Sequence, residues 1–154
     1  VNYKLLVKEH PAQETREWRD ISDYKEIMEI SNVILMHPTV PSQEILKKCS
    51  LVVTIGGTTG LEAAFYRKPS IILSEMDYSI LPSVELVQDV HKLSNKIKES
   101  LEKEVKADDL DRFIQIYEKN WYIFKNYLSS LFQYDNLIQT IKRDKGLDRK
   151  IELM

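Results

Sequence analysis

The chain has 154 residues, of which 43% are hydrophobic and 30% charged, a composition typical of a soluble globular protein with room for one core. Its net charge of -2 argues against a partner held mainly through a phosphate backbone, so no nucleic acid partner is expected. No apolar run approaches the roughly 18 residues of a membrane span, and the N-terminus lacks the layout of a signal peptide. We therefore expect a cytoplasmic, soluble domain.

Short apolar runs alternate with helix-favouring segments in the first half of the chain. Because strands separated by helices pair in parallel through crossovers, the pattern predicts an α/β fold with a single Rossmann-like doubly wound parallel sheet and C-terminal helices. A capping box of Asp23 and Glu26 is expected near the start of the first helix, and Ser42 is expected to cap the second. The predicted strands are residues 3–8, 32–37, 51–55, 70–73 and 84–87.

The second half of the chain has a helical pattern only, in residues 93–104, 110–132 and 137–145. Apolar residues recur there every three or four positions, which predicts a broad stripe that packs on the sheet or on a partner domain. We expect one domain, with a parallel α/β core at 1–90 and a helical extension at 91–154. The stripe consists of Leu110, Phe113, Ile114, Tyr117, Trp121, Phe124, Leu128 and Leu131.

A glycine- and threonine-rich loop follows the third predicted strand and opens a helix. Gly56 and Gly57 allow a ligand close to the backbone, while the amides and hydroxyls of Thr58 and Thr59 suit a phosphate. The structural alternative is a turn in which Thr59 caps the helix and Glu62 completes a capping box. The loop matches neither the P-loop nor the Gly-x-Gly-x-x-Gly pattern, which disfavours ATPase and dinucleotide-binding functions.

Two His-Pro pairs follow predicted strands, His10-Pro11 after the first and His37-Pro38 after the second. In a doubly wound sheet, ligands bind beyond the carboxyl ends of the strands, where both pairs fall. A histidine at a strand end is more often structural, so the dipeptide alone assigns neither pair. The three histidines are too scattered to predict a metal site, and no cofactor is expected. The lone Cys49 is expected to be a buried thiol.

The order of these motifs is more specific than any one of them. Over about residues 3–75, the chain resembles the C-terminal, nucleotide-sugar-binding half of a GT-B glycosyltransferase, and more narrowly the capsule polysaccharide biosynthesis family. That family includes enzymes of the 3-deoxy-manno-octulosonate transferase type. The segments that carry the resemblance are Leu6–Pro11, Asn32–Val33, Ser50–Thr54, Gly57–Ala64 and Lys68–Pro69.

The resemblance implies roles for particular residues. His10 and the threonine loop would engage the phosphate of a CMP- or UDP-linked sugar, with His10 as the catalytic group that stabilises the departing phosphate. Glu62 would accept a ribose or sugar hydroxyl, and Lys8 would assist from the end of the first strand. The expected nucleotide-sugar-binding residues are Lys8, Pro11, Gly56, Gly57, Thr58, Thr59 and Glu62.

The resemblance also implies that this chain is part of a larger, metal-independent enzyme. A preceding domain would bind the glycan acceptor, so the chain is expected to be inactive alone, and the full enzyme would associate peripherally with the membrane. The segment Ser74–Tyr78 stands where the family often has a glycine and an aromatic residue, which leaves the sugar and the base open.

Two alternatives remain beside this hypothesis. A UDP-N-acetylglucosamine 2-epimerase-like GT-B enzyme is disfavoured, because no arginine lies between Ser70 and Ser83. A non-catalytic module in polysaccharide export would instead dock through the aromatic stripe near Trp121 and Phe124.

Overall fold

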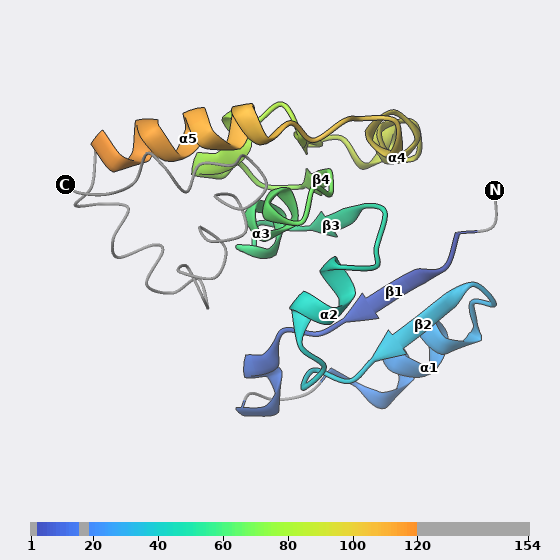
Figure 1. Cartoon of the computed structure of the whole chain (residues 1–154). Helices are drawn as coiled ribbons and strands as arrows, with labels where there is room; N and C mark the ends of the chain where they lie inside the picture. Colours follow the sequence, from blue (N-terminus) through green and yellow to red (C-terminus); the bar gives the residue numbers. More distant parts are fainter. Residues whose placement is uncertain (1–2, 16–18, 120–154) are drawn as a thin grey trace. The chain divides into compact units, whose positions relative to one another are not determined.

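The computed structural model describes residues 3–15 and 19–119 and divides the chain into two compact units, Val1–Ile45 and Leu46–Met154 (Figure 1). Each unit contains a parallel β-sheet with helices, which confirms the predicted α/β class. The prediction of one sheet differs from the structure, because the strand pairing stays within each unit, in sheets of two and three strands.

The first unit is a parallel strand pair with a helical crossover. Leu5 pairs with Val33 and Lys8 with Met36, and α1 lies against β2. The first strand ends at Lys8, and Pro11, which has no backbone N–H for a ladder, begins a 3-10 helix. The elements are β1 (Leu5–Lys8), η1 (Pro11–Thr15), α1 (Ile21–Glu29), β2 (Val33–Met36) and α2 (Ser42–Leu46), which ends in the second unit.

The start of α1 differs from the predicted capping box. The helix begins at Ile21 with Asp20 at the cap position and no side-chain cap hydrogen bond. Asp23 therefore lies inside the first turn, where its carboxylate is favourable near the positive end of the helix dipole. Ser42, expected as a cap, is the first residue of α2 itself.

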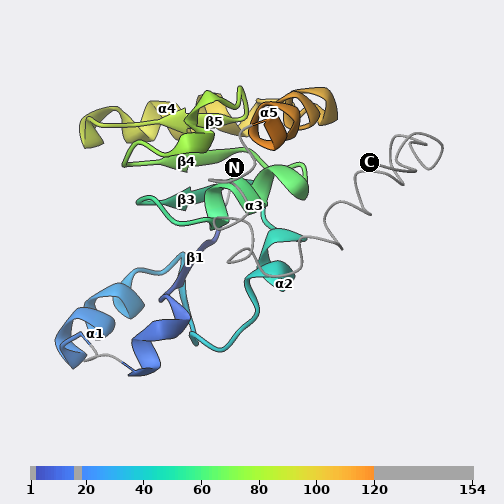
Figure 2. The ribbon, with the colours of Figure 1, turned by 90° about the vertical axis from the view of Figure 1, so that its left-hand side faces the viewer.

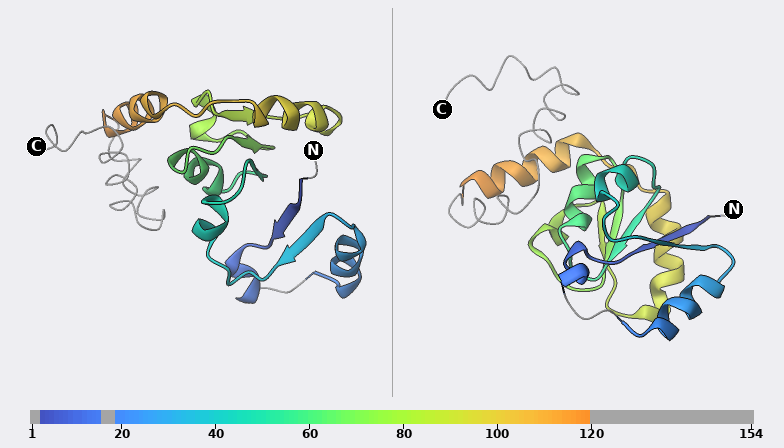
Figure 3. Two further views of the ribbon diagram at one scale, coloured as in Figure 1. Left: turned by 45° about the vertical axis from the view of Figure 1, so that its right-hand side comes forward. Right: turned by 90° about the horizontal axis from the view of Figure 1, so that it is seen from below.

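The second unit holds three parallel strands in the order β3-β4-β5, with β4 in the middle (Figure 2). Helix α3 contacts β3 and β4, α4 contacts β4, and the two helices lie on opposite sides of the strands (Figure 3). The elements are β3 (Val52–Thr54), α3 (Thr59–Phe65), β4 (Ser70–Ile72), η2 (Asp77–Ile80), β5 (Val84–Leu86), η3 (Val90–Lys92), α4 (Leu93–Leu101) and α5 (Ala107–Lys119).

The central strand β4 is buried on both faces, as expected of a strand covered by helices on either side. The Ser70 hydroxyl donates a hydrogen bond to the Gly60 carbonyl at 2.9 Å, which satisfies the buried hydroxyl and ties β4 to α3. On α5, residues Leu110, Phe113 and Ile114 of the predicted stripe are buried in the same core. The stripe residues from Trp121 onward lie outside the described part of the chain.

A charged clamp joins β5 to the α4 region. The Glu85 carboxylate lies 2.8 Å from Lys96 Nζ and 2.6 Å from Lys103 Nζ. Hydrogen bonds from Lys103 and then Lys96 hold the pKa of Glu85 below its usual value. Because the folded-state pKa is lowered, the stabilisation is complete above the unfolded pKa of about 4.3 and is lost as the pH falls through the folded value.

We predict that Glu85→Gln lowers the free energy of unfolding by about 1 kcal/mol at pH 7. The difference from the parent should shrink as the pH falls below about 4, because both chains then carry a neutral side chain at this position. Urea denaturation at a series of pH values measures this, with the exposed Glu102→Gln as the control. An equal loss of stability at neutral and acid pH would contradict the clamp.

Candidate functional site

The glycine-threonine loop of the second unit is held from several directions. The Gly57 N–H donates to Thr54 Oγ1 at 3.3 Å, and the Gly57 carbonyl accepts from the Gly60 N–H at 3.2 Å. The same carbonyl accepts the phenol of Tyr78 at 2.5 Å. Tyr78 is fully buried, so the loop is fixed to the core through η2.

Tyr78 was not predicted to support this loop. Its only signal was an aromatic residue shortly after the fourth strand, in the segment Ser74–Tyr78. A buried tyrosine requires a partner for its hydroxyl, and here the partner is a loop carbonyl 21 positions earlier. This hydrogen bond forms because the fold brings η2 next to the loop. The local sequence around Tyr78 does not show that proximity.

The glycines of this region are close to other groups of the protein. A Cβ at Gly60 would lie 2.7 Å from the Tyr78 hydroxyl oxygen and 3.2 Å from Ile72 Cγ2. A Cβ at Gly56 would lie 3.2 Å from Met76 Sδ, and one at Gly57 would lie 3.3 Å from Thr54 Oγ1. Gly60 is therefore required by internal packing, whereas Gly57 is the exposed glycine of the loop.

The capping box of Thr59 and Glu62, the structural alternative for this loop, does not form at the start of α3. The helix begins at Thr59, Thr58 occupies the cap position, and no side chain caps the helix. Instead, the Thr58 hydroxyl donates to Glu62 Oε1 at 2.9 Å. Within the described residues, no backbone carbonyl accepts from the N–H of Thr58 or Thr59. These two amides, the Thr59 hydroxyl and the second oxygen of Glu62 are polar groups that the loop offers a ligand.

In the first unit, His10 closes the turn after β1. Its Nδ1 accepts the Ala12 N–H at 3.1 Å, and its carbonyl accepts the Gln13 N–H at 2.8 Å. A ring nitrogen that accepts a hydrogen bond carries no proton, so the neutral ring has its N–H at Nε2. His10 and Pro11 are exposed, so this Nε2–H can donate to a ligand.

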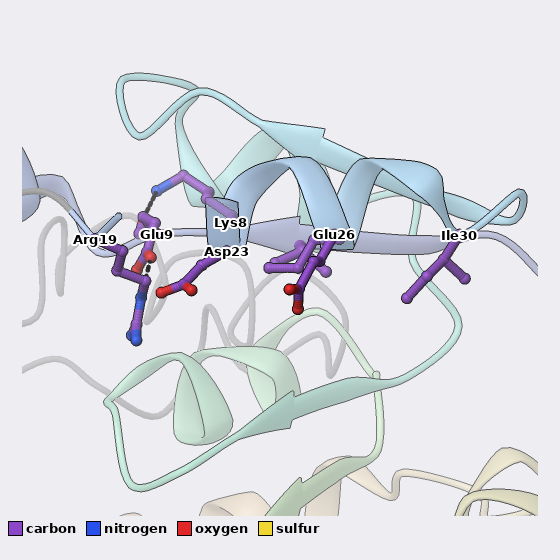
Figure 4. Close-up of a pocket in the computed structure, with 8 residues that line it drawn as sticks. Lys8, Glu9, Arg19, Asp23, Glu26 and Ile30 are labelled. Atoms are coloured by element: carbon purple, nitrogen blue, oxygen red, sulfur yellow. Dashed lines mark hydrogen bonds and ion pairs between the residues drawn. The ribbon is translucent and has the colours of Figure 1, made fainter. Parts of the chain in front are cut away.

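A cavity of about 510 Å³ lies beside β1 and α1, and Figure 4 shows its lining side chains. Lys8 lines it, with Nζ donating to the Glu9 carbonyl at 3.3 Å and a pKa lowered by burial. Glu9 is paired with Arg19 at 2.6 Å. With Asp23 and Glu26, the cavity is lined by three carboxylates and two cationic side chains. This excess of negative charge disfavours the binding of a phosphate. The lining comprises Val7, Lys8, Glu9, Arg19, Asp23, Glu26, Ile27 and Ile30.

The expected site residues therefore fall into two groups. Lys8, His10 and Pro11 lie in the first unit, where Lys8 lines the cavity and His10 does not. The residues from Gly56 to Glu62 lie in the second unit, where hydrogen bonds bring Thr58 to Glu62.

Three other features were considered: a metal site, a membrane-spanning helix and a reactive thiol. In the described ranges 3–15 and 19–119, no three His, Cys, Asp or Glu residues are placed to hold a metal ion. No helix in the part described is both long and apolar enough to cross a membrane. Cys49 is half-buried rather than buried, and burial raises the pKa of its thiol, which disfavours a reactive thiolate.

A comparison with models of protein families tests the family resemblance that the motifs indicated. The family model of the capsule polysaccharide biosynthesis protein matches residues 2–115. The chain belongs to this family. The match of the capsule polysaccharide biosynthesis family covers both loops described above and continues into α5, well beyond the roughly 75 residues that carried the resemblance. No curated protein and no solved structure matches the chain.

We predict that Tyr78→Phe loosens the loop without unfolding the second unit. Loss of the bond to the Gly57 carbonyl should lower the free energy of unfolding by about 1 kcal/mol and speed amide exchange at Gly57 and Thr58. Denaturation and hydrogen exchange followed by NMR measure the two effects. Tyr24→Phe, in the first unit, is the control, and unchanged exchange in the loop would contradict the role of Tyr78.

We predict that Gly60→Ala destabilises the protein by about 1–3 kcal/mol, because the new methyl group would overlap the Tyr78 hydroxyl. The matched control is Gly57→Ala, whose Cβ would meet only Thr54 Oγ1 at 3.3 Å. Thermal and urea denaturation compare the two. If Gly60→Ala lowered the free energy of unfolding less than Gly57→Ala, the close contact between position 60 and Tyr78 would not be destabilising, and the prediction would be wrong.

Proposed function

We propose that the chain is the nucleotide-sugar-binding part of a GT-B glycosyltransferase that acts in the synthesis of capsular or surface polysaccharide. The observation that carries the proposal is the family match over residues 2–115. It is supported by parallel strands whose carboxyl ends lead into His10 and into the glycine-threonine loop, since such ends are where α/β sheets bind ligands.

The proposed chemistry is the stabilisation of a departing phosphate. Transfer of a sugar from a nucleotide develops negative charge on the phosphate oxygens, and fixed donors aimed there lower the barrier. In the first unit, the donor is the Nε2–H of His10, whose ring is held by the Ala12 amide. The second unit, considered by itself, offers donors of the same kind: the N–H groups of Thr58 and Thr59 and the Thr59 hydroxyl.

The sugar or ribose would meet an acceptor at Glu62. One carboxylate oxygen of Glu62 already accepts the Thr58 hydroxyl, so a ligand hydroxyl would bind the other oxygen. The favoured donor is a CMP-linked sugar, with a UDP-linked sugar as the next candidate. The glycan acceptor would be bound by another part of the full enzyme, and this chain alone would then bind the nucleotide without transferring the sugar.

We predict that the chain binds at least one of CMP, CDP and UDP, and that His10→Asn weakens this binding roughly tenfold to a hundredfold. Asparagine can accept the Ala12 N–H in place of Nδ1, so the turn remains while the Nε2–H is lost. Isothermal titration calorimetry measures the affinities, with the exposed His91→Asn as the control. The proposal fails if none of the three nucleotides binds the parent chain.

A further inference from the structure

His37 repeats the turn geometry of His10 at the end of the neighbouring strand. Its Nδ1 accepts the Thr39 N–H at 3.3 Å and lies 2.7 Å from the Thr39 hydroxyl oxygen. Its carbonyl accepts the Val40 N–H at 3.1 Å, and Pro38 follows it. Both histidines thus follow a strand within two residues, precede a proline and accept the amide N–H two residues later.

The strand pairing places the two turns at one edge of the first sheet. Strands β1 and β2 are parallel neighbours with Lys8 opposite Met36, and their arrowheads point the same way in Figure 1. His10 comes two residues after Lys8, and His37 comes directly after Met36. Paired strands lie about 4.8 Å apart, which is close enough for two side chains at this edge to reach one ligand.

The hydrogen bonds also set which nitrogen of each ring carries the proton. The Thr39 amide can only donate, so Nδ1 of His37 accepts in this contact, as Nδ1 of His10 does from Ala12. The Thr39 hydroxyl, 2.7 Å away, can donate to the same nitrogen. We therefore assign the N–H of each neutral ring to Nε2. Both side chains are exposed, and the prolines that follow them have no backbone N–H, so the ring N–H groups are the donors that these turns offer.

We propose that His37 is a second phosphate-binding residue, whose Nε2–H donates to the same phosphoryl group as the Nε2–H of His10. This inference rests on the proposed function, because the phosphate is that of the nucleotide sugar. A purely structural histidine at position 37 would need only its Nδ1, whereas a binding residue needs Nε2 as well.

Two substitutions at position 37 separate these roles. In His37→Asn, the side-chain oxygen can still accept the Thr39 N–H, so the turn remains while the Nε2–H is lost. In His37→Gln, the longer side chain carries an amide N–H to about the place of Nε2 but cannot close the turn in the same way. If His37 binds phosphate, Asn weakens nucleotide binding about tenfold while Gln weakens it less.

The test is calorimetry of the full chain with CMP, CDP and UDP, using the parent, His37→Asn, His37→Gln and the His91→Asn control. Thermal denaturation should give the same midpoint for the parent and His37→Asn. If the parent binds a nucleotide and His37→Asn binds it equally well, this inference is overturned and the proposed function stands. If the parent binds none of the nucleotides, both are overturned.

NMR of the imidazole nitrogens gives a second readout that a purely structural role would not change. Addition of the nucleotide that binds should shift the Nε2 signals of both His10 and His37 while their Nδ1 signals remain those of an unprotonated nitrogen. A shift at His10 alone would overturn the role of His37, and the signal of His91 serves as the internal reference.

Discussion

The hydrogen bond from the phenol of Tyr78 to the carbonyl of Gly57 anchors the glycine-threonine loop to the core of the second unit. Tyr78 has no exposed surface, and its hydroxyl would clash with any side chain at position 60. The same residue therefore fixes the loop above it and requires a glycine in the first turn of α3. Because its ring is part of the core that includes Ile72, this hydrogen bond ties the loop to the core.

In the first unit, the turns after β1 and β2 are held by exposed histidines and not by a buried side chain. Each histidine folds its ring onto its own backbone, and the bond to the amide two residues later sets both the turn and the tautomer. A substitution that keeps this bond but removes Nε2–H would therefore separate the shape of the turn from its chemistry. Both units thus use internal hydrogen bonds to orient polar groups at the carboxyl ends of parallel strands.

Much of the fold could be predicted from the sequence, because local composition determines it. The β-branched runs around Val53 and Ile71 and the proline after His10 predicted strands and ends that the structure confirms within a residue or two. The arrangement of the strands in two sheets was not predictable, because it depends on which backbone ladders form between distant segments. For the same reason, the partner of Tyr78 could not be predicted.

The candidate site shows a similar division. Thr58 and Thr59 became candidates because their types and their position after a strand suit a phosphate, and His10 became one through the resemblance; the role of all three stays a prediction. The capping box was predicted from spacing alone, yet the spacing from Thr59 to Glu62 competes with that from Thr58 to Glu62, which are one helical turn apart. Spacing cannot decide between two hydroxyls that are adjacent in sequence, since the outcome depends on where the helix begins.

The Thr58–Glu62 hydrogen bond reduces the loss of side-chain entropy when a ligand hydroxyl binds to the Glu62 carboxylate. A glutamate that is free to rotate loses about 1–2 kcal/mol of side-chain entropy when it is ordered, and a ligand that orders it bears that cost. Here the fold has already restricted the side chain before any ligand arrives. A hydroxyl that approaches the second oxygen of Glu62 would meet an acceptor whose direction is fixed, so most of the energy of that contact would remain available for affinity.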